Sequence, residues 1–145
     1  MTDALVMDIP ALNAFLLRDF RQVSDEFVIE RVTAEELVVR LRVSERHLRP
    51  GGTVSGPSMF ALADVGMYLA ILARLGPVAL AVTTNCSIDF MRKPAAGADL
   101  IAKTRILKLG RVLAVGDVLL YSEGQAAPVA RAGLTYSIPP QSERA

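Results

Sequence analysis

The chain has 145 residues, a length that suits one domain with one sizeable hydrophobic core. Hydrophobic residues make up 52% of it and charged residues 21%, a balance that is typical of a compact globular protein and excludes a disordered one. The formal net charge of +1 provides no field for nucleic acid, so a phosphate-bearing ligand must rely on a few local Lys and Arg side chains.

The single cysteine, Cys86, excludes a disulfide framework within the chain, and one free thiol suits a reducing compartment. The first charged residues, Asp3 and Asp8, are acidic where a secretory signal would carry Lys or Arg. The longest apolar stretch, 58–73, is short for a bilayer span and is interrupted by Asp64. We therefore expect a cytoplasmic protein with neither a membrane nor a nucleic acid as partner.

The N-terminal region begins with a short amphipathic helix. Asp8 can cap it and Pro10 falls in its first turn, and the apolar face is Leu12, Phe15, Leu16 and Phe20. The pattern ends near Arg21, so we expect residues 1–25 to form a helical extension on the outside of a larger body.

Two strands are predicted next, at 27–32 and 37–43, joined by a hairpin loop at 33–36 and followed by a polar loop at 44–53. The strongest helix signal comes after this loop. It opens at Ser55-Gly56-Pro57-Ser58 and closes at Gly76-Pro77. The residues between are apolar on every side, which predicts a helix that is buried all round.

Four more strand-like runs follow, at 79–91, 100–109, 112–121 and 128–138. The order of helix, two strands, buried helix and a four-strand meander predicts an α+β fold, with one antiparallel sheet wrapped around the long helix. We expect a single domain over 1–145, with a frayed tail at 139–145.

Asp64 is the residue that breaks the apolar pattern of the long helix. It is the only charged residue between Pro57 and Ala73. Because an unpaired buried carboxylate is costly, something must offset that cost. One interpretation is a general base or nucleophile kept in a pocket. The other is a structural Asp that caps a loop or pairs with a buried Arg.

The start of the same helix is the second candidate feature. A buried helix N-terminus presents unpaired N–H groups and the positive end of the helix dipole. Gly56 lets a ligand approach its N–H, which could hold the oxyanion of an acyl-transfer intermediate, whereas Pro57 has no N–H. The alternative is that Ser55 and Gly56 only cap the helix. Asp64 follows Gly56 by eight residues, about 80° around the axis, so one substrate could lie between them.

The stretch Gly52-Thr53-Val54-Ser55-Gly56-Pro57, followed by Leu62-Ala63-Asp64, resembles the PaaI-type hotdog-fold acyl-CoA thioesterases, a family related to phenylacetic acid degradation. That family reads roughly G-T-x-H-G-G and then L-x-D. The run 83–91 before Pro94 is similar to the long third strand of the family, and Gly110-Arg111 also fits. The resemblance spans 27–138 and implies a hotdog fold, in agreement with the predicted order of elements.

The resemblance implies a role for each matching position. Asp64 would be the general base or nucleophile, and the Gly56 amide would polarise the thioester carbonyl. Thr83 would come from the neighbouring subunit and orient the attacking water. Ser55 stands where the family has its His and could position the carbonyl more weakly. The expected assembly is a homodimer or a dimer of dimers with active sites at the dimer interface.

Contacts with the substrate and its CoA moiety are expected at Arg49, Pro57, Asn85, Lys108, Gly110 and Arg111. Arg49 occupies the position of the family's upstream Asn, and Pro57 that of its second Gly. No cofactor is expected apart from the coenzyme A of the substrate, and no metal, since His47 is the only histidine. We expect His47 to be an exposed loop residue near the mouth of the site.

Two alternatives to a thioesterase remain at this point. The absence of the family's His at Ser55 would permit a non-catalytic domain that binds acyl-CoA or has a regulatory role. A hotdog hydratase pairs a His with an Asp near its long helix, but His47 lies upstream of the helix and does not fit that pattern well.

Overall fold

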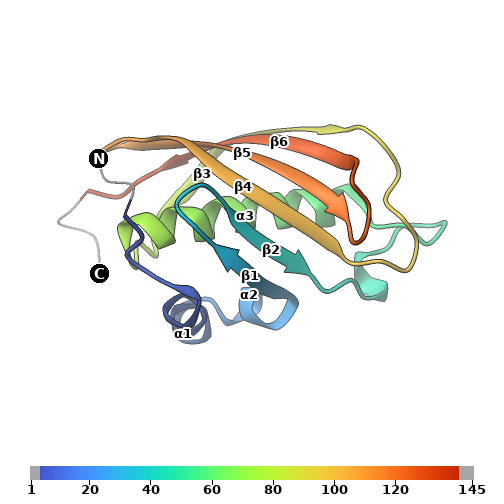
Figure 1. Ribbon diagram of the computed structural model, residues 1–145, viewed down its shortest axis with the longest axis horizontal. Helices are drawn as coiled ribbons and strands as arrows, with labels where there is room; N and C mark the ends of the chain where they lie inside the picture. The colour runs from blue at the N-terminus through green and yellow to red at the C-terminus, as the bar shows by residue number, and fades with distance from the viewer. Residues whose placement is uncertain (1–3, 141–145) are drawn as a thin grey trace.

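The computed structural model describes residues 4–140 (Figure 1). The elements in chain order are α1 (Ile9–Asp19), α2 (Arg21–Glu26), β1 (Phe27–Val32), β2 (Leu37–Leu41), the 3-10 turn η1 (Glu45–His47), α3 (Gly56–Leu75), β3 (Val82–Phe90), β4 (Leu100–Leu109), β5 (Leu113–Ser122) and β6 (Pro128–Ser137). The six strands form one antiparallel sheet that curves over α3, which confirms the predicted α+β class.

The order of strands in the sheet is β1-β2-β4-β5-β6-β3. Strands β4, β5 and β6 form the expected meander, but β3 does not begin it. The chain leaves β3 at one edge, passes through 91–99 and enters β4 near the other edge, because β2 and β5 already occupy both sides of β4. Strand β3 is consequently an edge strand whose one partner among the described strands is β6.

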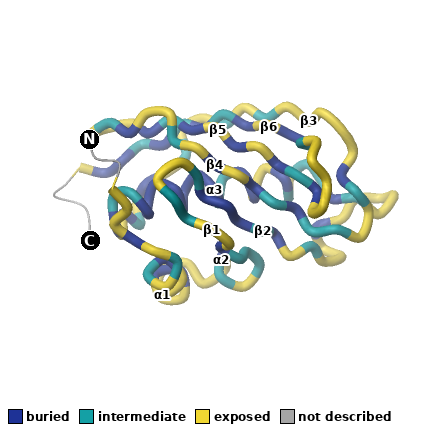
Figure 2. Tube along the Cα trace, viewed as in Figure 1, coloured by how far each residue is buried: buried dark blue, intermediate teal, exposed yellow. Residues whose placement is uncertain are grey.

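Helix α3 is the centre of the core. Ser55 caps it by accepting a hydrogen bond from the backbone N–H of Ser58 (3.3 Å), and Gly76 ends it with a positive φ of 90°. Gly66 allows the helix to approach β4, since a Cβ at this position would lie 2.6 Å from Oγ1 of Thr104. Figure 2 shows the helix largely buried beneath the sheet.

The prediction that α3 is buried all round is wrong for one stripe of its N-terminal half. Pro57, Phe60 and Ala61 are exposed there, with Phe60 at 40%, and Asp64 is half-buried. Their spacing of three and four residues places them on one side of the helix. The length and composition of α3 would also suit a membrane span, but 61% of its apolar segment is buried inside the protein. This burial is typical of a core helix.

The N-terminal helices pack on the outside of this body, as predicted. Asp8 caps α1 by accepting from the backbone N–H of Ala11 (3.0 Å). Leu12, Phe15 and Leu16 are almost fully buried, so the extension contributes to the core. The chain then turns at Phe20 into α2, which the sequence pattern did not separate from α1.

Several element ends differ from the predicted ones by a few residues. Strand β2 ends at Leu41 rather than at Val43, because the backbone N–H of Val43 donates to the carboxylate of Asp99 (2.9 Å) instead of to a strand. Strand β3 begins at Val82 rather than at Ala79. At the C-terminus Pro139 is buried, whereas 141–145 of the expected frayed tail lie outside the described residues.

Candidate active site

Asp64 lies in the third turn of α3 and receives two short hydrogen bonds from hydroxyl groups. Oγ1 of Thr83 donates to Oδ1 of Asp64 at 2.6 Å, and the hydroxyl of Tyr136 donates to the same oxygen at 2.7 Å. The Tyr136 hydroxyl also lies 3.1 Å from the backbone carbonyl of Asp64. Within residues 4–140 every hydrogen bond to this carboxylate reaches Oδ1, so Oδ2 remains available to another group.

The sheet brings these two donors together. Thr83 on β3 and Tyr136 on β6 are direct cross-strand partners, and the register of β3 shifts between Thr83 and Asn85. Such a bulge re-aims the side chains beside it. Tyr136 is 3% exposed, and its burial raises the pKa of the phenol well above the usual value. The negative charge of Asp64 adds to this shift, so Tyr136 stays protonated and acts as a donor.

The carboxylate opens onto a cavity of about 470 Å³. The polar side chains of its wall include Asp64, Thr83, Tyr136 and a second carboxylate, Asp19. The rest of the wall is Phe20, Val65, Tyr68, Ala79, Ala81 and Val82. We call this cavity the Asp64 pocket. A largely apolar cleft with a few convergent polar groups is the usual form of a small-molecule site.

Gly56 opens onto a different cavity, of about 450 Å³, which we call the Gly56 pocket. Its wall is Arg49, Thr53, Val54, Gly56, Met59, Phe90, Met91, Arg92, Lys93 and Pro94. As the first residue of α3, Gly56 has a backbone N–H with no intrahelical acceptor. The three basic side chains around it, Arg49, Arg92 and Lys93, suit a ligand with negative charge.

The Asp64 pocket and the Gly56 pocket share no lining residue, so within one chain Gly56 and Asp64 do not line one cavity. The expectation from the 80° spacing is wrong because eight helical residues also separate the two positions by about 12 Å along the axis. The expectation that Thr83 reaches Asp64 from a neighbouring subunit is wrong as well. Each chain packs its own β3 against its own α3.

The other predicted site residues lie at several places. Ser55 is committed to capping α3, and its hydroxyl also contacts that of Ser58 at 3.1 Å. Pro57 and Asn85 are exposed and line neither pocket. Of the predicted substrate contacts, Arg49 joins Gly56 in one cavity.

The turn between β4 and β5 carries Lys108, Gly110 and Arg111. Gly110 donates its backbone N–H to Leu113 (2.8 Å), and Ala114 pairs with Tyr136, so the turn lies at the end of the sheet where Thr83 is found. None of the three residues lines the Asp64 pocket or the Gly56 pocket. Lys108 instead borders a shallow polar hollow beside Arg105.

His47 is not the exposed loop residue that the sequence indicated. It is 7% exposed, and its Nε2 lies 2.5 Å from a carboxylate oxygen of Glu26. The backbone N–H of Ser44 donates to its Nδ1 at 2.9 Å. The imidazole therefore joins α2 to η1 and lines neither pocket.

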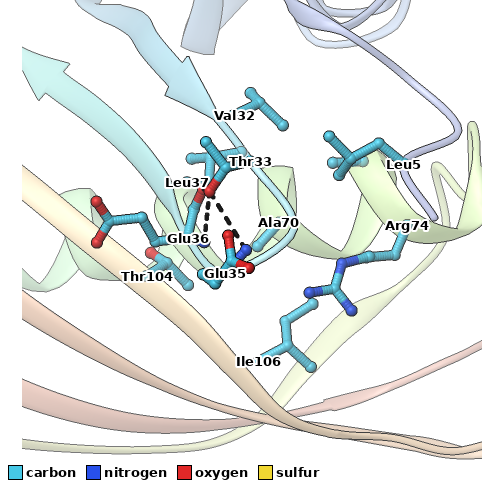
Figure 3. A pocket seen from close by; sticks show the side chains of 11 residues that line it. Leu5, Val32, Thr33, Glu35, Glu36, Leu37, Ala70, Arg74, Thr104 and Ile106 are labelled. Atoms are coloured by element: carbon cyan, nitrogen blue, oxygen red, sulfur yellow. Dashed lines mark hydrogen bonds between the residues drawn. The ribbon is translucent and has the colours of Figure 1, made fainter. Parts of the chain in front are cut away.

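A third cavity, between the β1–β2 hairpin and the end of α3, holds only about 10 Å³ (Figure 3). Figure 3 shows the hydroxyl of Thr33 accepting from the backbone N–H groups of Glu35 and Glu36, at 3.3 and 3.1 Å. The volume of this third cavity is too small for an acyl group. Among residues 4–140 no cluster of three or more His, Cys, Asp or Glu residues is placed to hold a metal ion.

Sequence reasoning missed Tyr136, Tyr68 and Phe20, which line the Asp64 pocket. In the sequence Tyr136 belongs to an alternating strand and reads as a core aromatic. The signal that could have identified it is the hydroxyl, since a buried Tyr needs a hydrogen-bond partner.

Comparison with known proteins identifies the family of the chain. Residues 51–129 match the model of the thioesterase superfamily. A Pseudomonas aeruginosa protein, named as a candidate esterase, is 34% identical over 96 residues, which cover 66% of this chain and 72% of that protein.

Two solved structures are also similar. A candidate thioesterase of Silicibacter is 62% identical, with 94% of each chain covered and a TM-score of 0.88. A mutant of the phenylacetic acid degradation protein PaaI of Thermus thermophilus is 28% identical over 87% of this chain and 99% of that one, with a TM-score of 0.68. Thioester hydrolysis is the general chemistry that these relatives support. The chain belongs to the thioesterase superfamily and has the hotdog fold.

Proposed function

We propose that this protein hydrolyses an acyl-CoA thioester to a free acid and coenzyme A, with Asp64 as general base and the Gly56 amide as oxyanion donor. The observation that carries the proposal is the arrangement of the Asp64 carboxylate. Two hydroxyl groups hold Oδ1, and the carboxylate faces an apolar pocket of about 470 Å³. A base held in one orientation beside a substrate cavity suits proton abstraction from water.

The reaction follows from these positions. A water molecule attacks the thioester carbonyl carbon while Oδ2 of Asp64 takes its proton, and the carbonyl oxygen becomes an oxyanion. A backbone N–H at the helix start, without a partner of its own, can stabilise that charge. The intermediate then collapses, the C–S bond breaks, and the proton on Asp64 passes to the departing thiolate. The products are the carboxylic acid and the CoA thiol.

A second copy of the chain would bring the donor to the base. Gly56 and Asp64 lie on either side of Phe60 on α3, at equal distances in sequence. If two α3 helices cross antiparallel at Phe60 about a two-fold axis, Gly56 of one copy lies opposite Asp64 of the other. Each dimer then contains two equivalent sites.

Exposed apolar surface supports this arrangement. Phe60 is 40% exposed on α3, and on the edge strand β3 Val82 is 55% and Phe90 53% exposed. Monomeric proteins usually cover such edges and faces, and an exposed strand edge can pair with another chain. We therefore propose a homodimer, or a dimer of two such dimers, with each active site shared between two subunits.

The basic side chains around Gly56 support an acyl-CoA rather than a neutral thioester. Arg49, Arg92 and Lys93 border the Gly56 pocket, and coenzyme A carries phosphate groups that such side chains attract. The acyl group would then extend into the apolar Asp64 pocket from the carbonyl held at Gly56.

Release of free thiol from a panel of acyl-CoAs tests the proposal, with CoA-induced thermal stabilisation measured in parallel. Turnover of at least one acyl-CoA is expected. Stabilisation by CoA without turnover would instead favour a non-catalytic binding domain. The hydratase alternative lacks its histidine at the site, because His47 is bound to Glu26 and Ser44 and lines neither pocket.

A further inference from the structure

Three aromatic rings form a row that leads away from the proposed base. Tyr136 contacts the Asp64 carboxylate through its hydroxyl. The ring of Tyr68 lies next, 6.4 Å from that of Tyr136. The ring of Phe20 follows, packed edge-on against Tyr68 with centroids 5.7 Å apart and an interplanar angle of 86°. All three line the Asp64 pocket, and in the order of these contacts Phe20 is the ring farthest from Asp64.

Phe20 comes from the N-terminal extension and not from the sheet or α3. It is the junction of α1 and α2, with φ of −149° and ψ of 61°. Its N–H donates to Leu16 (2.9 Å) and its carbonyl accepts from Val23 (3.1 Å), so the backbone on both sides is fixed. The side chain is 37% exposed although it is large and apolar, because it is directed to the open cavity instead of the core.

Tyr68 gives Phe20 a rigid support. It is 7% exposed, and its hydroxyl donates to the carbonyl of Ala79 at 3.2 Å. Burial, with a smaller contribution from the nearby charge of Asp19, raises the pKa of Tyr68 to about 12, so this donor is kept at neutral pH. A ring packed edge-on against a second, hydrogen-bonded ring has little freedom to move aside.

We infer that Phe20 is the specificity-determining residue of the Asp64 pocket and limits the length of the apolar acyl chain that the enzyme accepts. This inference rests on the proposed function, since it takes the thioester carbonyl to lie at Asp64. A chain that extends from the carbonyl passes Tyr136 and Tyr68 and meets the Phe20 ring. The N-terminal extension, through this one side chain, thus sets the substrate class of a site built by α3 and the sheet.

The experiment measures kcat/KM over straight-chain acyl-CoAs from acetyl-CoA to palmitoyl-CoA for the wild type, Phe20→Ala and Phe20→Trp. Leu17→Ala is the matched control, because Leu17 is also a large side chain of α1, is 54% exposed and does not line the pocket. Phe20→Ala should move the optimum to longer chains, with kcat/KM above the wild-type optimum rising about fourfold per added methylene group. Phe20→Trp should move the optimum to shorter chains, and Leu17→Ala should leave it in place.

Equal chain-length profiles for the wild type and both Phe20 variants would overturn the role of Phe20 while leaving the thioesterase intact. A shift in Leu17→Ala as large as that in Phe20→Ala would also overturn it, because the effect would then belong to the helix as a whole. Absence of turnover by the wild type on every acyl-CoA would refute the proposed function itself, and the length limit with it. Should Phe20→Ala fail to fold, Phe20→Leu provides the same comparison with a smaller expected shift.

Discussion

The hydroxyl of Tyr136 donates a 2.7 Å hydrogen bond to Oδ1 of Asp64, although 72 residues separate the two in the chain. Thr83, its cross-strand partner, donates to the same oxygen. Two donors on one oxygen fix the plane of the carboxylate and leave Oδ2 for the proton-accepting role that we propose. In that proposal Tyr136 is a positioning residue for the base.

Tyr136→Phe removes one of these two donors and keeps the ring in place. We expect kcat to fall about ten- to a hundredfold, the rate equivalent of one hydrogen bond to a charged group. KM should change little, since the ring still lines the pocket. Thr83→Val should behave alike. A change in KM with kcat preserved would assign Tyr136 to substrate binding only.

The Gly56 amide can be tested with two substitutions that add the same Cβ. In either variant this atom would lie 3.3 Å from Cζ of Phe90, and proline also adds Cγ and Cδ, with Cδ in place of the amide hydrogen. Gly56→Ala keeps the N–H, whereas Gly56→Pro removes it at a helix position where proline is tolerated. We expect Gly56→Pro to lose about 10²–10³-fold in kcat relative to Gly56→Ala, the usual effect of deleting one oxyanion donor. Equal kcat values in the two variants would exclude this amide from catalysis.

Mixed dimers of Asp64→Asn and Gly56→Pro test whether each site is shared between subunits. If Gly56 of one chain serves Asp64 of the other, a mixed dimer has one doubly damaged site and one intact site. Random remixing makes about half the dimers mixed, so roughly a quarter of all sites should recover activity. The two variants are unfolded, mixed, refolded and assayed, with exchange followed by native mass spectrometry. Activity at the mean of the separate variants, despite exchange, would show that each chain builds its site alone.

The contact between Glu26 and its basic neighbours predicts how stability depends on pH. The guanidinium of Arg46, followed by smaller contributions that include the imidazole of His47, holds the pKa of Glu26 below its ordinary value of 4.5. Because the pKa of Glu26 is lower in the folded state, its ionised carboxylate stabilises the fold above a pH of about 4.5. That stabilisation is lost as the pH falls through the folded-state pKa. Chemical denaturation of wild type and Glu26→Gln between neutral and acidic pH measures it. The free energy of unfolding should fall less on acidification for the variant than for the wild type. An equal fall in both would contradict the assignment.

The sequence was most informative where the signal is local. Asp8 does cap α1, the bounds of β1 and β4 match the predicted strands, and Gly76 ends α3 as expected. A capping side chain or a terminal glycine acts within one turn of its own position, so the pattern alone specifies it.

Features that depend on distant segments could not be read in the same way. Strand β3 pairs with β6 and not with β4, because β2 and β5 already occupy both sides of β4. His47 is polar and lies in a loop, yet Glu26, 21 residues earlier, holds it in a buried place. Asp64 is a candidate from the sequence because its charge breaks a local pattern, whereas Tyr136 fits its strand and gives no such signal.

The most direct test of the proposed mechanism is the kcat of Asp64→Asn on the best acyl-CoA of the panel. Asparagine preserves the shape of the side chain and removes the base, so we expect kcat to fall by about 10²–10⁴-fold. Circular dichroism and an unfolding curve close to those of the wild type would establish that the fold is kept. Thiol release by a folded Asp64→Asn variant at near the wild-type rate would contradict the account.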